Sequence, residues 1–180
     1  MDEVEAKYRL AGPEEHERLR ARLIALGARP GPAEDERNLL FDRGDGSLFR
    51  GDSVLRVRIL NGGPAGRLTY KGAATYQGAV KQRMELEVGV DDTATTRALL
   101  EALGYALSLE YSKHREPWHL EGAEVALDSL VFGTFCEIEG PRETIGRLAD
   151  TLGLSADAAE PAGYPMLMAR FTAAGARPAP

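Results

Sequence analysis

Glu3-Val4-Glu5-Ala6-Lys7, near the start of the 180-residue chain, is the stretch that decides the predicted fold. Side chains on a β-strand alternate between two faces, so Glu3, Glu5 and Lys7 share one face while Val4 and Ala6 take the other. Same-face neighbours lie about 6.6 Å apart, where two like charges repel by about 2.5 kcal/mol at an effective dielectric constant near 20 but by only about 0.6 kcal/mol in water. An enclosed row of this kind therefore requires a partner, such as a metal ion or a polyanion.

Charged and apolar side chains alternate in the same way along several other segments. The strand-like segments are residues 2–10, 36–42, 53–60, 67–72, 79–90, 107–116, 119–128 and 133–139. Short links rich in turn residues, such as Gly44-Asp45-Gly46, predict antiparallel pairing. Eight amphipathic antiparallel strands are compatible with closure into a barrel, and an open sheet would give the same pattern.

Three amphipathic helices are predicted to cover the apolar faces of these strands. They run from Pro13 to Leu26, from Asp92 to Gly104, and from the residue after Pro141 to Gly153, and a weaker signal covers residues 165–171. We expect one α+β domain over residues 1–172. A flexible tail is expected at residues 173–180, which are rich in Ala, Gly and Pro.

The composition narrows the classes of function. The formal net charge of −6 argues against binding to a nucleic acid polymer or an anionic membrane, because both require a basic surface. No apolar run is long enough to cross a bilayer, and acidic residues begin at position 2, so a cytoplasmic location is expected. With three histidines and the single Cys136, which is expected to be a core thiol, a hard metal with oxygen ligands is favoured over zinc.

Long charged side chains occur on these strands in same-sign pairs. The pairs are Glu3 with Glu5, Arg56 with Arg58, Glu85 with Glu87, and Glu137 with Glu139. A solvated sheet face is the ordinary explanation for any one strand, but such faces usually mix Ser, Thr and Gln with the charges. Arginine and lysine suit phosphate oxygens, and clustered carboxylates suit Mg²⁺ or Mn²⁺, which also bridge phosphates. Together the pairs favour a site for a metal-bound polyphosphate.

These motifs, in this order, resemble the CYTH superfamily, also called the triphosphate tunnel metalloenzymes. The matching blocks are Glu3-Val4-Glu5-Ala6-Lys7 for the family's ExExK signature, Leu55-Arg56-Val57-Arg58, Leu68-Thr69-Tyr70-Lys71-Gly72, Arg83-Met84-Glu85-Leu86-Glu87, Lys113-His114-Arg115, and Asp128 followed by Phe135-Cys136-Glu137-Ile138-Glu139. Together the blocks extend the resemblance over roughly residues 1 to 170, and six ordered blocks are far more specific than one short motif.

The resemblance implies a fold, a set of site residues and a cofactor. The implied fold is an eight-stranded antiparallel β-barrel, the triphosphate tunnel, with helices outside. The implied phosphate ligands are Lys7, Arg56, Arg58, Lys71, Arg83, Lys113 and Arg115. The implied ligands of Mg²⁺ or Mn²⁺ are Glu3, Glu5, Asp128, Glu137 and Glu139, and Glu85 and Glu87 would support a second metal or the basic side chains. Lys7 and Glu5 are the implied catalytic residues.

The sequence leaves three functions open. The first is metal-dependent hydrolysis of a phosphoanhydride bond in a small molecule that carries a triphosphate, such as tripolyphosphate, thiamine triphosphate or a nucleoside triphosphate. The second is class IV adenylate cyclase chemistry, which converts ATP to cyclic AMP and pyrophosphate. The third is a non-catalytic module that binds polyphosphate or nucleotide. Trp118 could stack on a base, although a core position is the commoner one for a lone tryptophan, and the resemblance is compatible with a homodimer.

Overall fold

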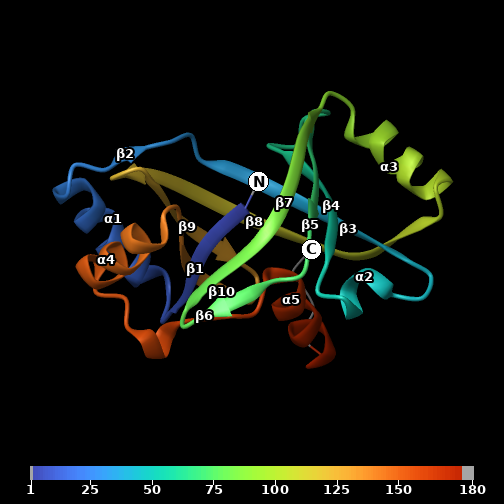
Figure 1. Ribbon diagram of the computed structural model, residues 1–180. Coiled ribbons are helices and arrows are strands. Elements are labelled where there is room, and N and C mark those ends of the chain that lie inside the picture. Colours follow the sequence, from blue (N-terminus) through green and yellow to red (C-terminus); the bar gives the residue numbers. More distant parts are fainter. Residues whose placement is uncertain (1, 176–180) are drawn as a thin grey trace. The chain divides into compact units, whose positions relative to one another are not determined.

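The structure, a computed structural model that describes residues 2–175, divides into two compact units. The first consists mainly of Glu34–Thr75 and Arg83–Lys113, and the second mainly of Glu3–Ala33, Tyr76–Gln82 and the described residues after Lys113. Both units are built from sheet strands and carry helices of their own (Figure 1). The strands β7 (Val80–Val90) and β8 (Tyr105–Leu120) each contribute residues to both units.

The sheet of the second unit has the strand order β1-β10-β9-β8. Its other strands are β1 (Asp2–Leu10), β10 (Gly133–Glu139) and β9 (Ala123–Leu130), and the short β2 (Arg29–Pro30) pairs with β8. In the antiparallel register, Lys7 of β1 lies opposite Glu137 of β10. Residues directly opposite each other share a face of the sheet, so this register gathers the charged residues of β1 and β10 on one side.

The opposite side of the same sheet forms the core of the second unit. There the row Tyr8, Cys136 and Leu127 crosses three strands. The helices α1 (Pro13–Ala25) and α4 (Arg142–Leu152) lie side by side (Figure 1) and contribute Leu19, Leu23, Ile145, Leu148 and Leu152 to this core. The predicted core position of Cys136 is confirmed, since the residue is fully buried. Burial raises the pKa of its thiol, and the nearby carboxylates of Asp128 and Glu137 raise it further.

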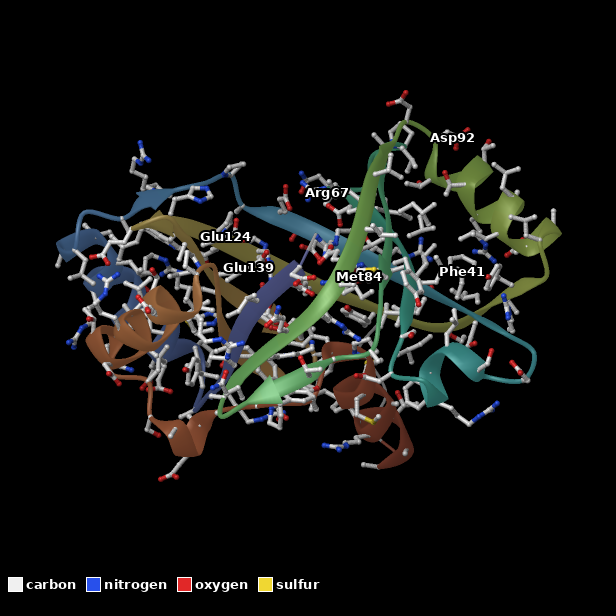
Figure 2. The ribbon with its side chains drawn as sticks, viewed as in Figure 1. Phe41, Arg67, Met84, Asp92, Glu124 and Glu139 are labelled. Atoms are coloured by element: carbon white, nitrogen blue, oxygen red, sulfur yellow. The ribbon has the colours of Figure 1, made fainter. Side chains whose placement is uncertain are left out.

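The sheet of the first unit has the strand order β8-β3-β4-β5-β7. Its further strands are β3 (Glu34–Arg43), β4 (Val54–Leu60) and β5 (Gly66–Lys71). Phe41, labelled in Figure 2, packs with Leu39, Val57 and Leu100, the last from helix α3 (Thr93–Ala102). Gly66 begins β5, where this strand pairs with β4. A side chain is not tolerated at this position, because a Cβ there would lie 1.9 Å from the carbonyl oxygen of Arg58. The backbone of β5 can therefore lie directly against the strand that carries the paired arginines.

The predicted α+β class with eight long antiparallel strands is confirmed, and the details differ at several places. The segment predicted at 119–128 is wrong in its bounds, because β8 continues to Leu120 and the turn at Glu121 and Gly122, both with positive φ, separates it from β9. Elements that the sequence did not reveal are β2, β6 (Thr75–Gln77), the one-turn helix α2 (Ser47–Arg50) and a 3₁₀ turn at Ala156–Ala158.

The predicted helices are all present, including the weakest one. That last helix is α5 (Tyr164–Ala173), which is longer than the pattern suggested. In α3 the side chain of Leu100 is buried, while those of Leu99 and Leu103 are exposed, because α3 contacts β4 and β5 through one narrow face. Residues 176–180 of the predicted tail lie outside the described residues. The domain limit at residue 172 stays a prediction. Within residues 2–175 no helix has the length and apolar character needed to span a membrane.

Candidate functional site

The charged side chains of the first unit lie in rows that cross its strands. Arg58 lies opposite Asn38 on one side and Arg67 on the other. Arg56 lies opposite Thr69, which in turn lies opposite Glu87. Lys71 lies opposite Glu85. Because opposite residues share a face, the structure brings the predicted residues of these three strands to one charged surface, which we call the cationic face.

Two predicted acids of the cationic face lie against basic side chains. Lys71 Nζ is 2.9 Å from Glu85 Oε2. Glu87 accepts a hydrogen bond from the Thr69 hydroxyl at 2.8 Å and lies 3.0 Å from an Nη of Arg67. Of the two roles predicted for Glu85 and Glu87, the structure therefore favours support of the basic side chains.

Arg56 is the most enclosed arginine of this face. Burial lowers the pKa of its guanidinium, but Tyr111 and the carboxylates of Glu36, Glu85 and Glu87 raise it by more, so the group remains charged. Its Nη2 donates to Thr69 Oγ1 at 3.3 Å, and its Nε is buried with no hydrogen-bond partner among the described residues. A buried charged donor of this kind suits an anionic ligand.

Glu36 of β3 links Arg58 to Lys113 of β8, and both Glu36 and Lys113 are therefore included in the cationic face. Its Oε2 lies 3.1 Å from Arg58 Nε and 3.6 Å from Lys113 Nζ, and its side chain is fully buried. Asn38 donates to the same carboxylate oxygen at 3.3 Å. The structure thus brings Lys113, a predicted phosphate ligand, close to Arg58 through an acid that sequence analysis did not select.

Arg83 differs from the other predicted phosphate ligands. Its Nε donates to the carbonyl oxygen of Gly72 at 2.9 Å, and its Nη2 donates to that of Asp52 at 2.6 Å. These bonds tie two loops of the first unit together. The structure therefore gives Arg83 a structural role, and phosphate binding by this residue stays a prediction.

The second unit carries a row of carboxylates, which we call the acidic row. Glu5 of β1 lies opposite Glu139 of β10, which lies opposite Glu124 of β9. Figure 2 labels Glu124 and Glu139 on these two strands. Like charges directly opposite each other are destabilising unless a cation is near. Here Lys81 Nζ lies 2.8 Å from Glu5 and Arg115 Nη1 lies 3.7 Å from Glu124.

The acidic row offers the type of ligand that Mg²⁺ and Mn²⁺ prefer, which is carboxylate oxygen. Among the residues that the structure describes, no three acidic, histidine or cysteine side chains are already gathered in the arrangement of a metal site. The donor chemistry therefore fits a hard divalent cation, and binding it would require the carboxylates to move from their present partners.

Asp128 and Arg115, predicted to bind metal and phosphate respectively, bind each other. Arg115 Nε donates to Asp128 Oδ1 at 2.8 Å and Nη2 donates to Oδ2 at 2.7 Å, and Nη2 also contacts Glu137. The Tyr164 hydroxyl donates to Asp128 Oδ2 at 2.7 Å. Burial and the carboxylates of Asp128 and Glu137 raise the pKa of that hydroxyl, so it stays protonated and donates. This geometry favours Asp128 as the residue that orients Arg115.

Lys7 of the opening motif is enclosed by groups from two parts of the second unit. Its Nζ donates to the carbonyl oxygen of Ala162 at 2.8 Å, lies 3.6 Å from Glu137, and lies 4.1 Å from the centre of the Tyr164 ring. A cation over an aromatic face is stabilised by the ring quadrupole. The segment before α5 thus holds the ammonium that the sequence predicts to bind phosphate.

Several residues of these surfaces were missed by sequence reasoning. Lys81 shares strand parity with Arg83 and Glu85, so the alternation could have revealed it. Glu36 and Asn38 share a face with the apolar Leu40, which hides their parity signal. Tyr164 carries no signal, because its contact with Asp128 spans 36 residues of the chain.

Comparison with known proteins places this arrangement among CYTH domains. The profile of the CYTH domain matches residues 1–167. The Pyrococcus horikoshii protein PH1012 has a similar structure, with a TM-score of 0.79, 25% sequence identity, and coverage of 92% of this chain and 99% of that one. No curated protein matches the chain in sequence.

Two further proteins of similar structure are each described as a "putative" adenylate or adenylyl cyclase. The Vibrio parahaemolyticus protein has a TM-score of 0.80 and 20% identity, with 93% of this chain and 97% of that one covered. The Hippeastrum protein HpAC1 has a TM-score of 0.72 and 21% identity, with coverage of 98% and 97%, and is described as having a dominant triphosphatase activity. At these identities the two structures support the fold.

Replacing Tyr164 by Phe should destabilise the protein by about 2 kcal/mol, because it removes a hydrogen bond to the buried carboxylate of Asp128. The ring that lies under Lys7 is kept. Urea unfolding followed by circular dichroism measures the change. Tyr76→Phe is the matched control, since the exposed Tyr76 donates its hydroxyl hydrogen to the Pro161 carbonyl oxygen, and loss of this bond should change stability by less than about 1 kcal/mol. Equal losses in the two variants would contradict a special role of the Asp128 contact.

Glu87 stabilises the folded protein at neutral pH, and this stabilisation should be lost in acid. Burial raises its pKa, but the Thr69 hydroxyl and the guanidinium groups of Arg58, Arg67 and Arg56 lower it by more, so the folded pKa lies below the ordinary value of 4.5. Its stabilisation is therefore present above pH 4.5 and is lost as the pH falls through the folded pKa. Urea unfolding at a series of pH values should show a shallower acid loss for Glu87→Gln than for the wild type. Glu101→Gln, which changes an exposed acid of α3, should follow the wild type.

Proposed function

The chain belongs to the CYTH domain family, and on that basis we propose that it is a divalent-metal-dependent enzyme that hydrolyses a phosphoanhydride bond of a small triphosphate-bearing molecule. The observation that carries the proposal is the excess of basic over acidic side chains on the partly buried cationic face of the first unit. Against its three acids, Glu36, Glu85 and Glu87, the described part of the cationic face carries five bases. These bases are Arg56, Arg58, Arg67, Lys71 and Lys113. A polyanion would balance this excess.

The cationic face supplies the phosphate ligands. Arg56 and Arg58 would each present a planar fork of N–H donors to phosphate oxygens, and Lys113 would act as a compact point charge. All three are buried, with less than a tenth of each residue exposed. Charge–charge attraction is stronger in such an environment than at a solvated surface, so binding there selects highly charged anions.

The acidic row supplies the metal ligands. Glu5 and Glu139 of this row, together with the buried Glu3, which lies two residues before Glu5 on β1, would hold Mg²⁺ or Mn²⁺. Glu137 and Asp128 hold Lys7 and Arg115 in place. When bound, such an ion neutralises phosphate oxygens and polarises the bond that breaks. Glu5 would orient the attacking water, and Lys7 would neutralise the charge on the leaving phosphate. Most of the rate enhancement would come from positioning and charge compensation.

Hydrolysis is favoured over cyclisation by one side chain and one relative. Trp118, which could have stacked on a base, lies 6% exposed within the hydrophobic core of the second unit. The structurally similar HpAC1 is described as dominated by triphosphatase activity. Both support a site that recognises the triphosphate itself.

Purified protein with Mg²⁺ or Mn²⁺ should release orthophosphate from tripolyphosphate, thiamine triphosphate or ATP, and a chelator should abolish the release. Orthophosphate, pyrophosphate and cyclic AMP are measured separately for each substrate. Cyclic AMP with pyrophosphate would establish the cyclase instead, and binding without any product would indicate a non-catalytic module. Activity that persists in chelator would refute the metal-dependent mechanism.

Glu5→Gln should lower metal-supported turnover by at least about a hundredfold, because it removes a charge from both the metal ligands and the water-orienting group. Manganese titration should show weaker binding in the same variant. Glu17→Gln is the control, since Glu17 is an exposed acid of α1 that pairs with Arg20. Turnover retained by Glu5→Gln at saturating metal would exclude this role for Glu5.

A further inference from the structure

We propose that Glu36 is a positioning residue that fixes Arg58 and Lys113 for phosphate binding, an inference that rests on the proposed function. Glu36 would touch no substrate. It would act through the two cations that share its carboxylate.

The contacts show how the carboxylate restrains the arginine. Glu36 Oε2 lies 3.1 Å from Arg58 Nε, and Asn38 Oδ1 accepts a hydrogen bond from the same Nε at 3.3 Å. Asn38 Nδ2 in turn donates to Glu36 Oε2, which closes a small ring of interactions. A guanidinium held through Nε has a fixed plane, and its terminal Nη groups are those that form the forked contact with phosphate.

The same oxygen restrains Lys113. Its Nζ lies 3.6 Å from Glu36 Oε2, so the two cations lie within about 7 Å of each other, a distance at which like charges repel strongly when they are buried. Only 3% of the Lys113 side chain and 10% of the Arg58 side chain are exposed, and Glu36 is fully buried. The acid therefore lets two cations remain close together in a place where water cannot screen them.

Stability alone does not explain this arrangement. A buried ion pair loses so much hydration that well-packed apolar residues often stabilise a protein equally well. Glu36 lies on the face of β3 that also carries Asn38, opposite Arg58, whereas the core of the first unit is built from the opposite face with Leu39 and Phe41. A costly acid on the face that would meet the ligand is explained by the fixed position it gives to its two partners.

The test compares Glu36→Gln and Glu36→Asp with the wild type in the full-length protein. Glu110→Gln is the matched control, because Glu110 belongs to the same unit and pairs with Arg37, which neighbours Glu36, at an exposed site. Two measurements are made on each protein. One is the NMR signal of the Arg58 Nε–H, assigned by its loss in Arg58→Lys, and its exchange with water. The other is the affinity for tripolyphosphate in the presence of a chelator, measured by calorimetry.

The wild type should show a slowly exchanging Arg58 Nε–H, which Glu36→Gln should lose and Glu36→Asp should keep in part. Tripolyphosphate affinity should fall at least about tenfold in Glu36→Gln, by less in Glu36→Asp, and by less than about twofold in Glu110→Gln. Unchanged exchange, or affinity that stays level or rises in the Glu36 variants, would overturn the inference. If circular dichroism shows that Glu36→Gln is unfolded, the results for Glu36→Asp alone decide whether Glu36 positions the two cations. A wild type that binds no tripolyphosphate would refute the proposed function, and the exchange measurement would still decide whether Glu36 fixes Arg58.

Discussion

A charge removed from water must be compensated by its immediate neighbours, and this constraint organises both units of the protein. In the first unit, the buried cations Arg58 and Lys113 share the carboxylate of Glu36. In the second, the fully buried Asp128 receives both the fork of Arg115 and the hydroxyl of Tyr164. Each unit thus compensates its buried charges with partners of its own.

This compensation determines which ligands can bind. Metal ions and phosphates would have to displace existing partners of the site residues, because Glu5 already accepts a hydrogen bond from Lys81 and Lys7 already donates one to the Ala162 carbonyl oxygen. A ligand must offer more charge than the partner it displaces, which favours a triphosphate with its metal over a monophosphate. The neutral organic part of a substrate contributes little to such an exchange, so selectivity would rest mainly on the number of charges.

The sequence predicts the fold and the type of site better than it predicts individual roles. Alternation on strands placed Arg56 and Arg58 correctly beside one another, and the ordered motifs identify the CYTH family. Alternation assigns a face to a residue but not a partner, so it could not show that Asp128 orients Arg115. Nor could it show Arg83 bound to backbone carbonyl groups, or Tyr164 bound to Asp128, because those contacts depend on loops and on long-range packing.

The buried position of Cys136 has a practical consequence for spectroscopy. It is the one cysteine of the chain, it lies in the core beneath α1 and α4, and burial raises the pKa of its thiol, so little reactive thiolate forms in the folded protein. A cysteine introduced at an exposed site such as Glu17 would then be the thiol that reacts with a maleimide dye or a spin label. The natural chain is thus already a background for single-site labelling, and no cysteine has to be removed first.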